Sequence, residues 1–303
     1  MRWYKEIVYL SWHFGLRAMW DIAIRPRLEK EYSRDEGLLS FLSRVSKDKL
    51  DELRSVRKHE LRKASEDCTI WVCWFQGEAN MPETIKKCHE SLRRNKGNHN
   101  IILISNENLN DYVSLPDFII SKHDKGIISN PHFSDIIRCY LLWRYGGIWI
   151  DAAVFVLNGI EVKKPFDTFK FKEDNSINLK WGIQYMVTEK DFYLFKFAYD
   201  YLVEYWRLYD KPIVYLLLDH VLELAYRNNT VIKKIIDEIP LNNEGFHWSR
   251  YHFNDKCEPR VYNELIKNNQ FLSLTWRLPY RIHNENGQLT YYGQLMKDFD
   301  RPQ

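Results

Sequence analysis

Residues 132–156 read HFSDIIRCYLLWRYGGIWIDAAVFV and combine the clearest structural pattern with the most unusual charge in the chain. In the first half, apolar side chains recur every three to four residues, which predicts a helix with one buried face. Ser134 or Asp135 is expected to cap its start, because a side-chain oxygen there can accept hydrogen bonds from the first-turn N–H groups. Gly146 and Gly147 are expected to end the helix, since glycine adopts the left-handed conformation common at helix ends.

The second half, residues 148–156, is β-branched and aromatic, and its one charged residue is Asp151. This composition predicts a strand buried on both faces. An ionised carboxylate there is costly unless a cation, a hydrogen-bond donor or water meets it. Asp151 therefore either ends the strand, facing solvent or a nearby arginine, or belongs to a binding site. Asp135 and Arg138 lie three residues apart on one helix face, where they can form a structural ion pair or join the same site.

The neighbouring segments predict a parallel sheet with helical crossovers. Strands are expected at residues 69–75 and 101–105, and helices at residues 81–95 and 115–122. In such sheets, ligands bind beyond the carboxyl ends of the strands. The residues expected at that edge are Trp74, Phe75, Gln76, Ser105, Asn106 and Asp151.

Further along the chain, residues 181–187 are expected to form another strand. Residues 192–210 and 212–227 are expected to form long aromatic-rich helices. Asp219 lies within the second of these helices, among leucines. It either belongs to a surface stripe or closes the floor of the site near the acceptor.

The motif SDIIR at residues 134–138, followed by YGGIWIDA at residues 145–152, resembles bacterial capsular polysaccharide synthesis proteins. These are similar to the sugar transferases in which a D-x-D motif follows a GG-x-[YW]-x-D turn. The similarity extends back to WFQGEANMPE at residues 74–83 and forward to about residue 278. It implies an α/β fold of the GT-A (Rossmann-like) type with a mostly parallel central sheet. It also implies a hexosyltransferase-type enzyme.

The implied reaction moves a sugar from a nucleotide-sugar donor, expected to be UDP-linked, to a capsule or exopolysaccharide precursor, with retention at the anomeric carbon. The acceptor would be a glycan or a lipid-linked glycan. The resemblance and the residue chemistry give the catalytic set the same roles. Asp135 accepts hydrogen bonds from sugar hydroxyls, the forked guanidinium of Arg138 binds phosphate or a hydroxyl pair, and Asp151 holds Mn²⁺ or Mg²⁺.

The residues expected to bind the nucleotide sugar are Trp74, Phe75, Gln76, Asn106, Ser134, Asp135, Arg138 and Gly147. Trp74 or Phe75 would stack on the base; the alternative for each is simple core packing. One departure from the D-x-D pattern is Ala153, which replaces the second carboxylate. A metal ion would then rely on diphosphate, water, and His247 or His283 as a later ligand, and metal-independent catalysis is the alternative.

Residues 1–65 are expected to form a basic, aromatic, helical N-terminal segment, and residues 66–303 the catalytic domain. Its first 27 or so residues dock on that domain through their aromatic side chains, contact a membrane surface, where aromatic and basic side chains are common, or do both. Five scattered cysteines indicate a reducing compartment, and no apolar run is long enough to span a membrane. No secretory signal is expected. A cytoplasmic protein, free or peripheral on the inner face of the bacterial plasma membrane, fits these features.

A net charge of only +3 gives no reason to expect nucleic acid as a partner. Two other classes of function stay open. A non-catalytic nucleotide-sugar-binding subunit of a polysaccharide assembly complex is one alternative, because the metal motif is reduced. A nucleotidyltransferase is the other, although the chain has no G-x-x-x-x-G-K phosphate loop.

Overall fold

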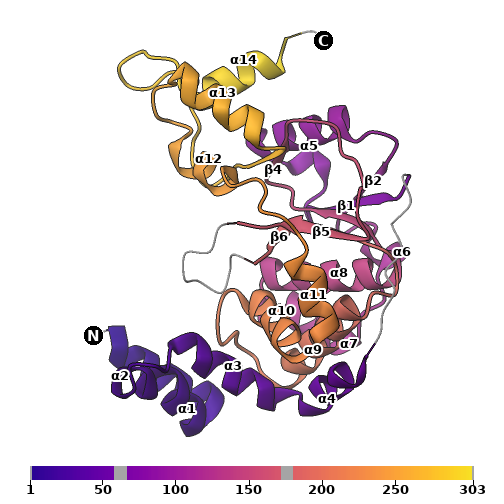
Figure 1. Cartoon of the computed structure of the whole chain (residues 1–303), viewed down its shortest axis with the longest axis vertical. Coiled ribbons are helices and arrows are strands. Elements are labelled where there is room, and N and C mark those ends of the chain that lie inside the picture. The colour runs from indigo at the N-terminus through magenta and orange to yellow at the C-terminus, as the bar shows by residue number, and fades with distance from the viewer. Residues whose placement is uncertain (1, 58–66, 172–179, 302–303) are drawn as a thin grey trace.

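The computed structural model describes residues 2–57, 67–171 and 180–301. A central sheet lies across the middle of the molecule, between an N-terminal group of helices at one end and a C-terminal group at the other (Figure 1). The predicted boundary between residues 65 and 66 lies outside the described residues.

The central sheet has five strands in the order β2-β1-β3-β6-β5. Their bounds are β1 Thr69–Cys73, β2 Asn100–Ile104, β3 Gly147–Ile150, β5 Phe166–Phe169 and β6 Gly182–Thr188. Strand β1 pairs in parallel with β2 and β3, whereas β6 is antiparallel to both β3 and β5. Four strands therefore point the same way and β6 alone is reversed, so the prediction of a mostly parallel sheet is confirmed.

The strand predicted at residues 148–156 is two strands. Strand β3 ends at Ile150, and the chain turns through Asp151 before β4, Val154–Val156, which pairs with β7, Phe271–Ser273, in a separate sheet. The N–H of Val154 donates to the Asp151 carbonyl at 3.0 Å, which closes this turn. Asp151 thus lies at the end of the central sheet, where its N–H still donates to the Gln184 carbonyl of β6 at 2.9 Å. The apolar pattern continues after it because β4 is buried as well.

Helix α8, Asn130–Arg144, begins earlier than expected. Its N-cap is Ser129 and Pro131 occupies its first turn, where the missing N–H of proline does no harm. Ser134 and Asp135 are therefore inside the helix, and the prediction that one of them caps it is wrong. This places both side chains one turn deeper, on the body of the helix.

Each face of the sheet is covered by its own hydrophobic core. Trp71 and Trp149, paired in register, pack toward α8, α9 (Tyr193–Leu208) and α10 (Leu217–Asn228). Ile70 and Ile148 point the other way, toward α5 (Glu83–Asn95). The strands are thus buried on both faces, as their composition predicted. Helix α10 starts later than residue 212, because residues 212–216 form turns and bends.

The remaining helices surround this unit (Figure 1). They are α6 Leu109–Tyr112, α7 Asp117–Asp124, α11 Thr230–Asp237, α12 Phe246–His252, α13 Pro259–Asn268, α14 Tyr291–Phe299 and the 3-10 turn Glu78–Asn80. Helices α12 to α14 pack around a third apolar core with β4 and β7, whose members include Phe155 and Leu272.

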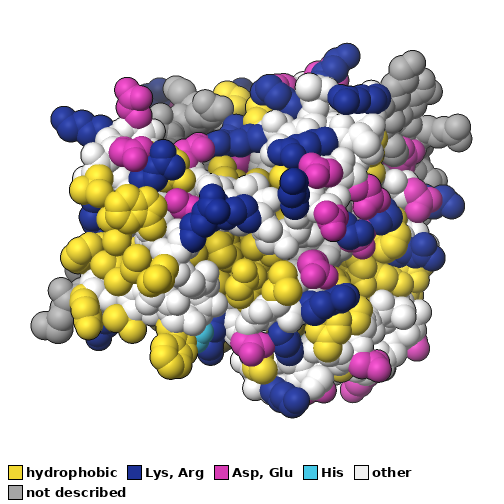
Figure 2. Space-filling view, turned by 90° about the horizontal axis from the view of Figure 1, so that it is seen from below, with side chains coloured by type: hydrophobic (Ala, Val, Ile, Leu, Met, Phe, Trp, Pro, Cys, Tyr) yellow, Lys and Arg dark blue, Asp and Glu magenta, His cyan; other side chains and the backbone are white. Residues whose placement is uncertain are grey.

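The N-terminal helices are α1 (Arg2–Met19), a π-helical turn (Trp20–Ile24), α2 (Arg25–Leu28), α3 (Arg34–Val45) and α4 (Lys47–Ser55). Leu38 and Leu42 of α3 and Leu50 and Leu53 of α4 are buried in the same core as α8 to α10. Leu10, Ala18 and Ile22 belong to that core as well, so the docking alternative for the first residues is observed. Figure 2 shows that the lower face of the molecule, on the side of these helices, also carries exposed hydrophobic groups.

None of the helices in the described part of the chain is both long and apolar enough to cross a lipid bilayer.

Candidate active site at the carboxyl end of β3

A buried arginine joins α8 to the end of β3. One guanidinium nitrogen of Arg138, Nη2, donates to Oδ1 of Asp151 at 2.8 Å. The indole N–H of Trp149 donates to the same oxygen at 2.7 Å, and the guanidinium carbon lies 4.8 Å from the centre of a Trp149 ring. The Arg138 side chain is 4% exposed and that of Asp151 is 32% exposed. Asp151 is therefore the outer member of the pair, and Arg138 and Trp149 fix it from inside.

Asp135 approaches the same arginine from the preceding turn of α8. Its Oδ1 lies 3.6 Å from Nη1 of Arg138, an ion pair without a hydrogen bond. Within the described residues, Nε and Nη1 of Arg138 have no hydrogen-bond partner. Burial raises the pKa of Asp135 to about 7, against the Arg138 charge and with help from Asp219 and Asp151. Desolvation lowers the pKa of Arg138. The charges of the three carboxylates raise it by more, so the pKa of Arg138 lies above its usual value.

Asp219 is a third carboxylate of this cluster. It is 5% exposed on α10, so the alternative of a surface stripe is wrong. Desolvation raises its pKa to about 6, while Arg138 is the main charge that opposes the rise. Its Oδ2 is buried and has no hydrogen-bond partner among the residues that the structure describes.

Unlike Asp219, the neighbouring buried polar residues on α10 each have a charged partner. Glu223 pairs with Lys180 at 3.1 Å and with Arg227 at 2.6 Å, and His220 lies 3.6 Å from Asp35. In the sequence, the acidic residue Asp219 follows a run of leucines and precedes a valine and a leucine. That pattern could not tell a buried helix from an exposed one.

The predicted edge of the sheet does bring several residues together. The N–H of Asn106, after β2, donates to the Phe75 carbonyl, after β1, at 2.9 Å. Burial raises the pKa of the Cys73 thiol to about 12, opposed by a hydrogen bond with Ser134, and the charges of Asp151 and Arg138 also act on it. The end of β1 therefore adjoins both the arginine cluster and the segment after β2.

The two aromatic candidates at this edge lie in different surroundings. Phe75 is buried, and its ring centre lies 5.5 Å from that of Phe133, so it packs in the core. Trp74 is half-buried and meets exposed Trp276 edge to face at 6.4 Å. Next to them, Gln76 is exposed, and its carbonyl accepts a hydrogen bond from the Asn80 side chain at 2.7 Å. Trp74 is thus the aromatic group with free surface.

Gly147 lies at the other end of β3 from Asp151. It pairs with Thr188, the last residue of β6, and a Cβ there would lie 2.4 Å from the Thr69 carbonyl oxygen. Its φ of 95° is also unfavourable for any other residue. The structure does not bring Gly147 to the cluster, and the close approach of β1 accounts for the glycine.

The cluster offers a cation little beyond Asp151. No group of three or more His, Cys, Asp or Glu side chains that could hold a metal ion occurs within the described ranges. His247 packs against the rings of Phe171 and Phe246, and exposed His283 forms a backbone bridge with Leu289. The oxygen that suits a hard cation is Oδ2 of Asp151, because Oδ1 already accepts two hydrogen bonds.

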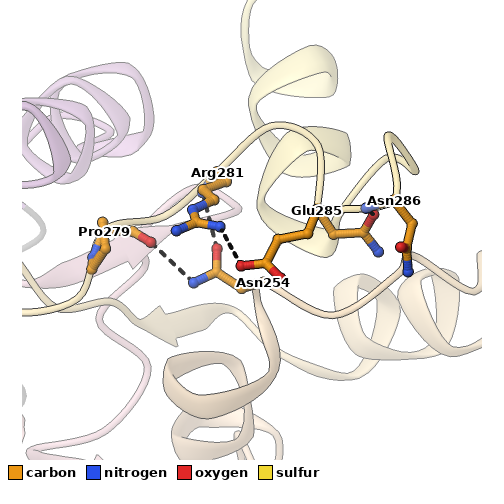
Figure 3. Close-up of a pocket in the computed structure, with 6 residues that line it drawn as sticks. Asn254, Pro279, Arg281, Glu285 and Asn286 are labelled. Carbon is orange, nitrogen blue, oxygen red and sulfur yellow. Dashed lines mark hydrogen bonds and ion pairs between the residues drawn. The ribbon is translucent and has the colours of Figure 1, made fainter.

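A polar hollow of about 310 Å³ lies elsewhere, beside the loop before α14 (Figure 3). Its lining residues are Asn254, Pro279, Arg281, Asn284, Glu285 and Asn286. The Asn254 amide bonds the Pro279 carbonyl and the Arg281 N–H, and Arg281 pairs with Glu285 at 3.2 Å. These contacts hold the loop together and account for much of the polar lining.

Two known proteins are similar to parts of this chain. The O-glycosyltransferase braB of Annulohypoxylon truncatum is 31% identical over 104 residues, which cover 31% of this chain and 25% of that protein. The match thus spans about a quarter of that relative's length. A solved structure described as PaToxG glycosyltransferase covers 67% of this chain and 83% of its own, with 15% identity and a TM-score of 0.40.

The family comparison covers far more of the chain. The model for capsular polysaccharide synthesis proteins matches residues 21–295, which includes α8, β3, α10 and most of the N-terminal helices. The chain therefore belongs to the family of capsular polysaccharide synthesis proteins.

Proposed function

We propose that the chain is a glycosyltransferase of the GT-A type that moves a hexose from a UDP-linked nucleotide-sugar donor to a capsule or exopolysaccharide precursor. The observation that carries this proposal is the cluster at the end of β3, where buried Arg138 pairs with Asp151 and Asp135 and is close enough to Asp219 for their charges to interact. Family membership and the glycosyltransferase relative support sugar transfer in general.

Asp151 is the residue proposed to meet the donor. It is the most exposed of the cluster, and its Oδ1 is fixed by Arg138 and Trp149 while Oδ2 accepts no hydrogen bond from the described residues. When bound, Mn²⁺ or Mg²⁺ would be held by Oδ2 together with diphosphate oxygens, and it would neutralise the charge of the leaving diphosphate. Asp135, 13% exposed, would accept hydrogen bonds from sugar hydroxyls.

Arg138 is proposed to orient Asp151 from inside rather than to grip phosphate directly. Its side chain is 4% exposed, and within the described residues Nη2 donates to Asp151 while Nε and Nη1 have no hydrogen-bond partner. An arginine keeps its charge when buried, so it can hold a carboxylate in one orientation at any physiological pH. Trp74, with free surface at the same edge, is the side chain proposed to stack on the base, with Gln76 and Asn106 beside it.

Retention is proposed for the stereochemistry, because a same-face displacement needs no protein base. Inversion would require a carboxylate that reaches the acceptor hydroxyl. Asp219 does not suit that role, because it is 5% exposed and its unpartnered Oδ2 has essentially no accessible surface. Its place is the floor of the cluster, where its charge acts on Arg138 and Asp135.

The test is a panel of UDP-, GDP- and CMP-linked sugars, each with and without Mn²⁺. One donor class is expected to raise the melting temperature by several degrees, since a ligand that binds only the folded state stabilises it. The same donor is expected to lose its sugar slowly to water or to an added glycan, which releases free nucleotide.

The outcomes separate the alternatives. Binding without any release of nucleotide, across a range of glycan acceptors, would favour a non-catalytic nucleotide-sugar-binding subunit of an assembly complex. Failure of every donor to bind would contradict the proposal. A melting shift that needs Mn²⁺ would support the metal role of Asp151, and one that is equal without it would support catalysis by the protein charges alone.

A further inference from the structure

Helix α1 buries one side against the protein and leaves another uncovered. Leu10 and Ala18 are 1% exposed, and Phe14 packs against Phe41 and Tyr209 with ring centres 5.6 and 5.2 Å away. The large apolar side chains left exposed on α1 and the following turn are Trp3, Tyr4, Val8, Trp12, Leu16 and Trp20, which we call the α1 face. Docking of the helix therefore buries only part of its apolar surface.

The α1 face is strongly exposed on both sides of Gly15, whose non-helical backbone (φ 86°, ψ 167°) kinks α1 between Trp12 and Leu16. Trp12 is 83% exposed, Leu16 73% and Tyr4 69%. Tyr4, Val8 and Trp12 follow one another at four-residue spacing, which places them on one side of the helix. They line a shallow apolar hollow of about 380 Å³ together with Lys5, Tyr9 and His13. Figure 2 shows hydrophobic groups gathered on this side of the molecule, with both basic and acidic groups beside them.

The charges around the α1 face are unbalanced. Residues 2–30 contain six Lys or Arg and three Asp or Glu. Each of the three acids already pairs with an arginine: Glu6 with Arg34, Asp21 with Arg44 and Glu29 with Arg25, at 2.8 to 3.2 Å.

Three exposed cations of the same stretch, Lys5, Arg17 and Lys30, have no ion pair within the described residues. The α1 face thus presents an apolar surface whose uncompensated charge is positive.

We infer that the α1 face binds the surface of a membrane that contains anionic lipids. A helix of this kind lies in the interface, with its tryptophans at headgroup level and its cations near lipid phosphates. Anionic lipid would neutralise Lys5 and Arg17, which strengthens binding at the membrane surface. A second copy of the chain would instead bring the same unpaired cations together across a twofold interface. The inference does not depend on the proposed function.

The test is flotation of the full chain with vesicles of pure phosphatidylcholine or with 30% phosphatidylglycerol added. The native chain is expected to bind anionic vesicles at least tenfold more tightly than neutral ones, and less tightly as salt rises. Tyr4→Ser with Trp12→Ser is expected to weaken binding at least tenfold, and so is Lys5→Glu with Arg17→Glu. These residues are exposed, so each variant should keep the native melting temperature.

The matched control is Tyr251→Ser, because Tyr251 on α12 is 69% exposed, as Tyr4 is. It is expected to bind vesicles like the native chain. Equal binding to neutral and anionic vesicles, or an equal loss in the Tyr251 variant, would overturn the inference. So would a native dimer that ignores vesicles and that Tyr4→Ser with Trp12→Ser converts to a monomer, since the α1 face would then be a self-interface.

Discussion

Arg138 is surrounded by more negative charge than one guanidinium can neutralise. Asp151 takes its short hydrogen bond, Asp135 lies 3.6 Å away, and Asp219 acts on it through space. Burial makes a second and third ionised carboxylate costly in such a place. The pKa values of Asp135 and Asp219 are accordingly raised to about 7 and about 6. Near neutral pH the cluster is therefore ready to gain or lose a proton when a charged ligand arrives.

Replacing Asp135 by Asn should remove a specific dependence of stability on pH. The pKa of Asp135 is about 7 in the folded chain and near 3.9 when unfolded, so the folded state binds more protons between these values. Stability due to this group therefore falls as pH rises from 4 to 7 and then levels off. Between pH 5 and pH 8, Asp135→Asn should gain on the order of 2 kcal/mol relative to the native chain.

Urea unfolding of both proteins at several pH values measures this difference. Asp111→Asn is the control, because Asp111 is exposed on α6 and should show the native dependence. If the unfolding free energies of Asp135→Asn and the native chain changed with pH in parallel, the pKa of Asp135 would not be raised.

At the residue scale, the sequence predicted which residues could meet but not which would be buried. Helical spacing put Asp135 and Arg138 on one face, and the break in an apolar strand identified Asp151. Both are local signals. The burial of Asp219 depends on α10 packing against α8, and the burial of Phe75 depends on Phe133. Long-range contacts of this kind leave no pattern within a single segment.

Among the elements, the turn between α8 and β3 positions the cluster. Gly146 and Gly147 both have positive φ. A Cβ added to either glycine would lie 2.4 Å from a backbone atom of another segment. The Trp71 indole N–H also donates to the Gly146 carbonyl at 2.9 Å. Strand β3 can lie against β1 and β6 only because this turn has no side chains, and Asp151 follows four residues later.

Gly147→Ala should therefore destabilise the fold by about 3 kcal/mol, from the positive φ together with the clash against the Thr69 carbonyl. Gly159→Ala is the matched control, since a Cβ there meets nothing within 4 Å, and it should change stability by less than about 0.5 kcal/mol. Chemical denaturation compares the two. Equal losses would mean that β3 can shift to accommodate a side chain, which would contradict the close approach described here.

Element types were easier to predict than their ends. The alternation of strands and helices was confirmed for β1, α5, β2 and α8. The start of α8 was misplaced because Pro131, at its first turn, was a stronger start signal than Ser134 or Asp135. Residues 148–156 looked like one strand because β3 and β4 are both buried. Only their hydrogen-bond partners, β1 and β6 for one and β7 for the other, separate them.

At the scale of the whole molecule, the N-terminal helices and the sheet share one hydrophobic core. The Tyr201 hydroxyl of α9 donates to the Leu42 carbonyl of α3 at 2.5 Å, and the Asn229 amide donates to the Leu53 carbonyl of α4 at 2.8 Å. The family match begins at residue 21, within this helical segment. The amphipathic pattern of α3 and α4 predicted a buried face, but it could not say which surface covers it.

The central claim is that the chain transfers sugar and that the transfer requires the carboxylate of Asp151. Asp151→Asn keeps an oxygen for Arg138 and Trp149 but loses the charge, and Asp111→Asn serves as the control for a neutralised exposed acid. With the donor identified by the panel, the direct measurement is the initial rate of sugar transfer for both variants, at matched melting temperature. The account predicts a loss of at least about 100-fold for Asp151→Asn and a native rate for Asp111→Asn. Transfer by Asp151→Asn within a few-fold of the native rate would contradict it.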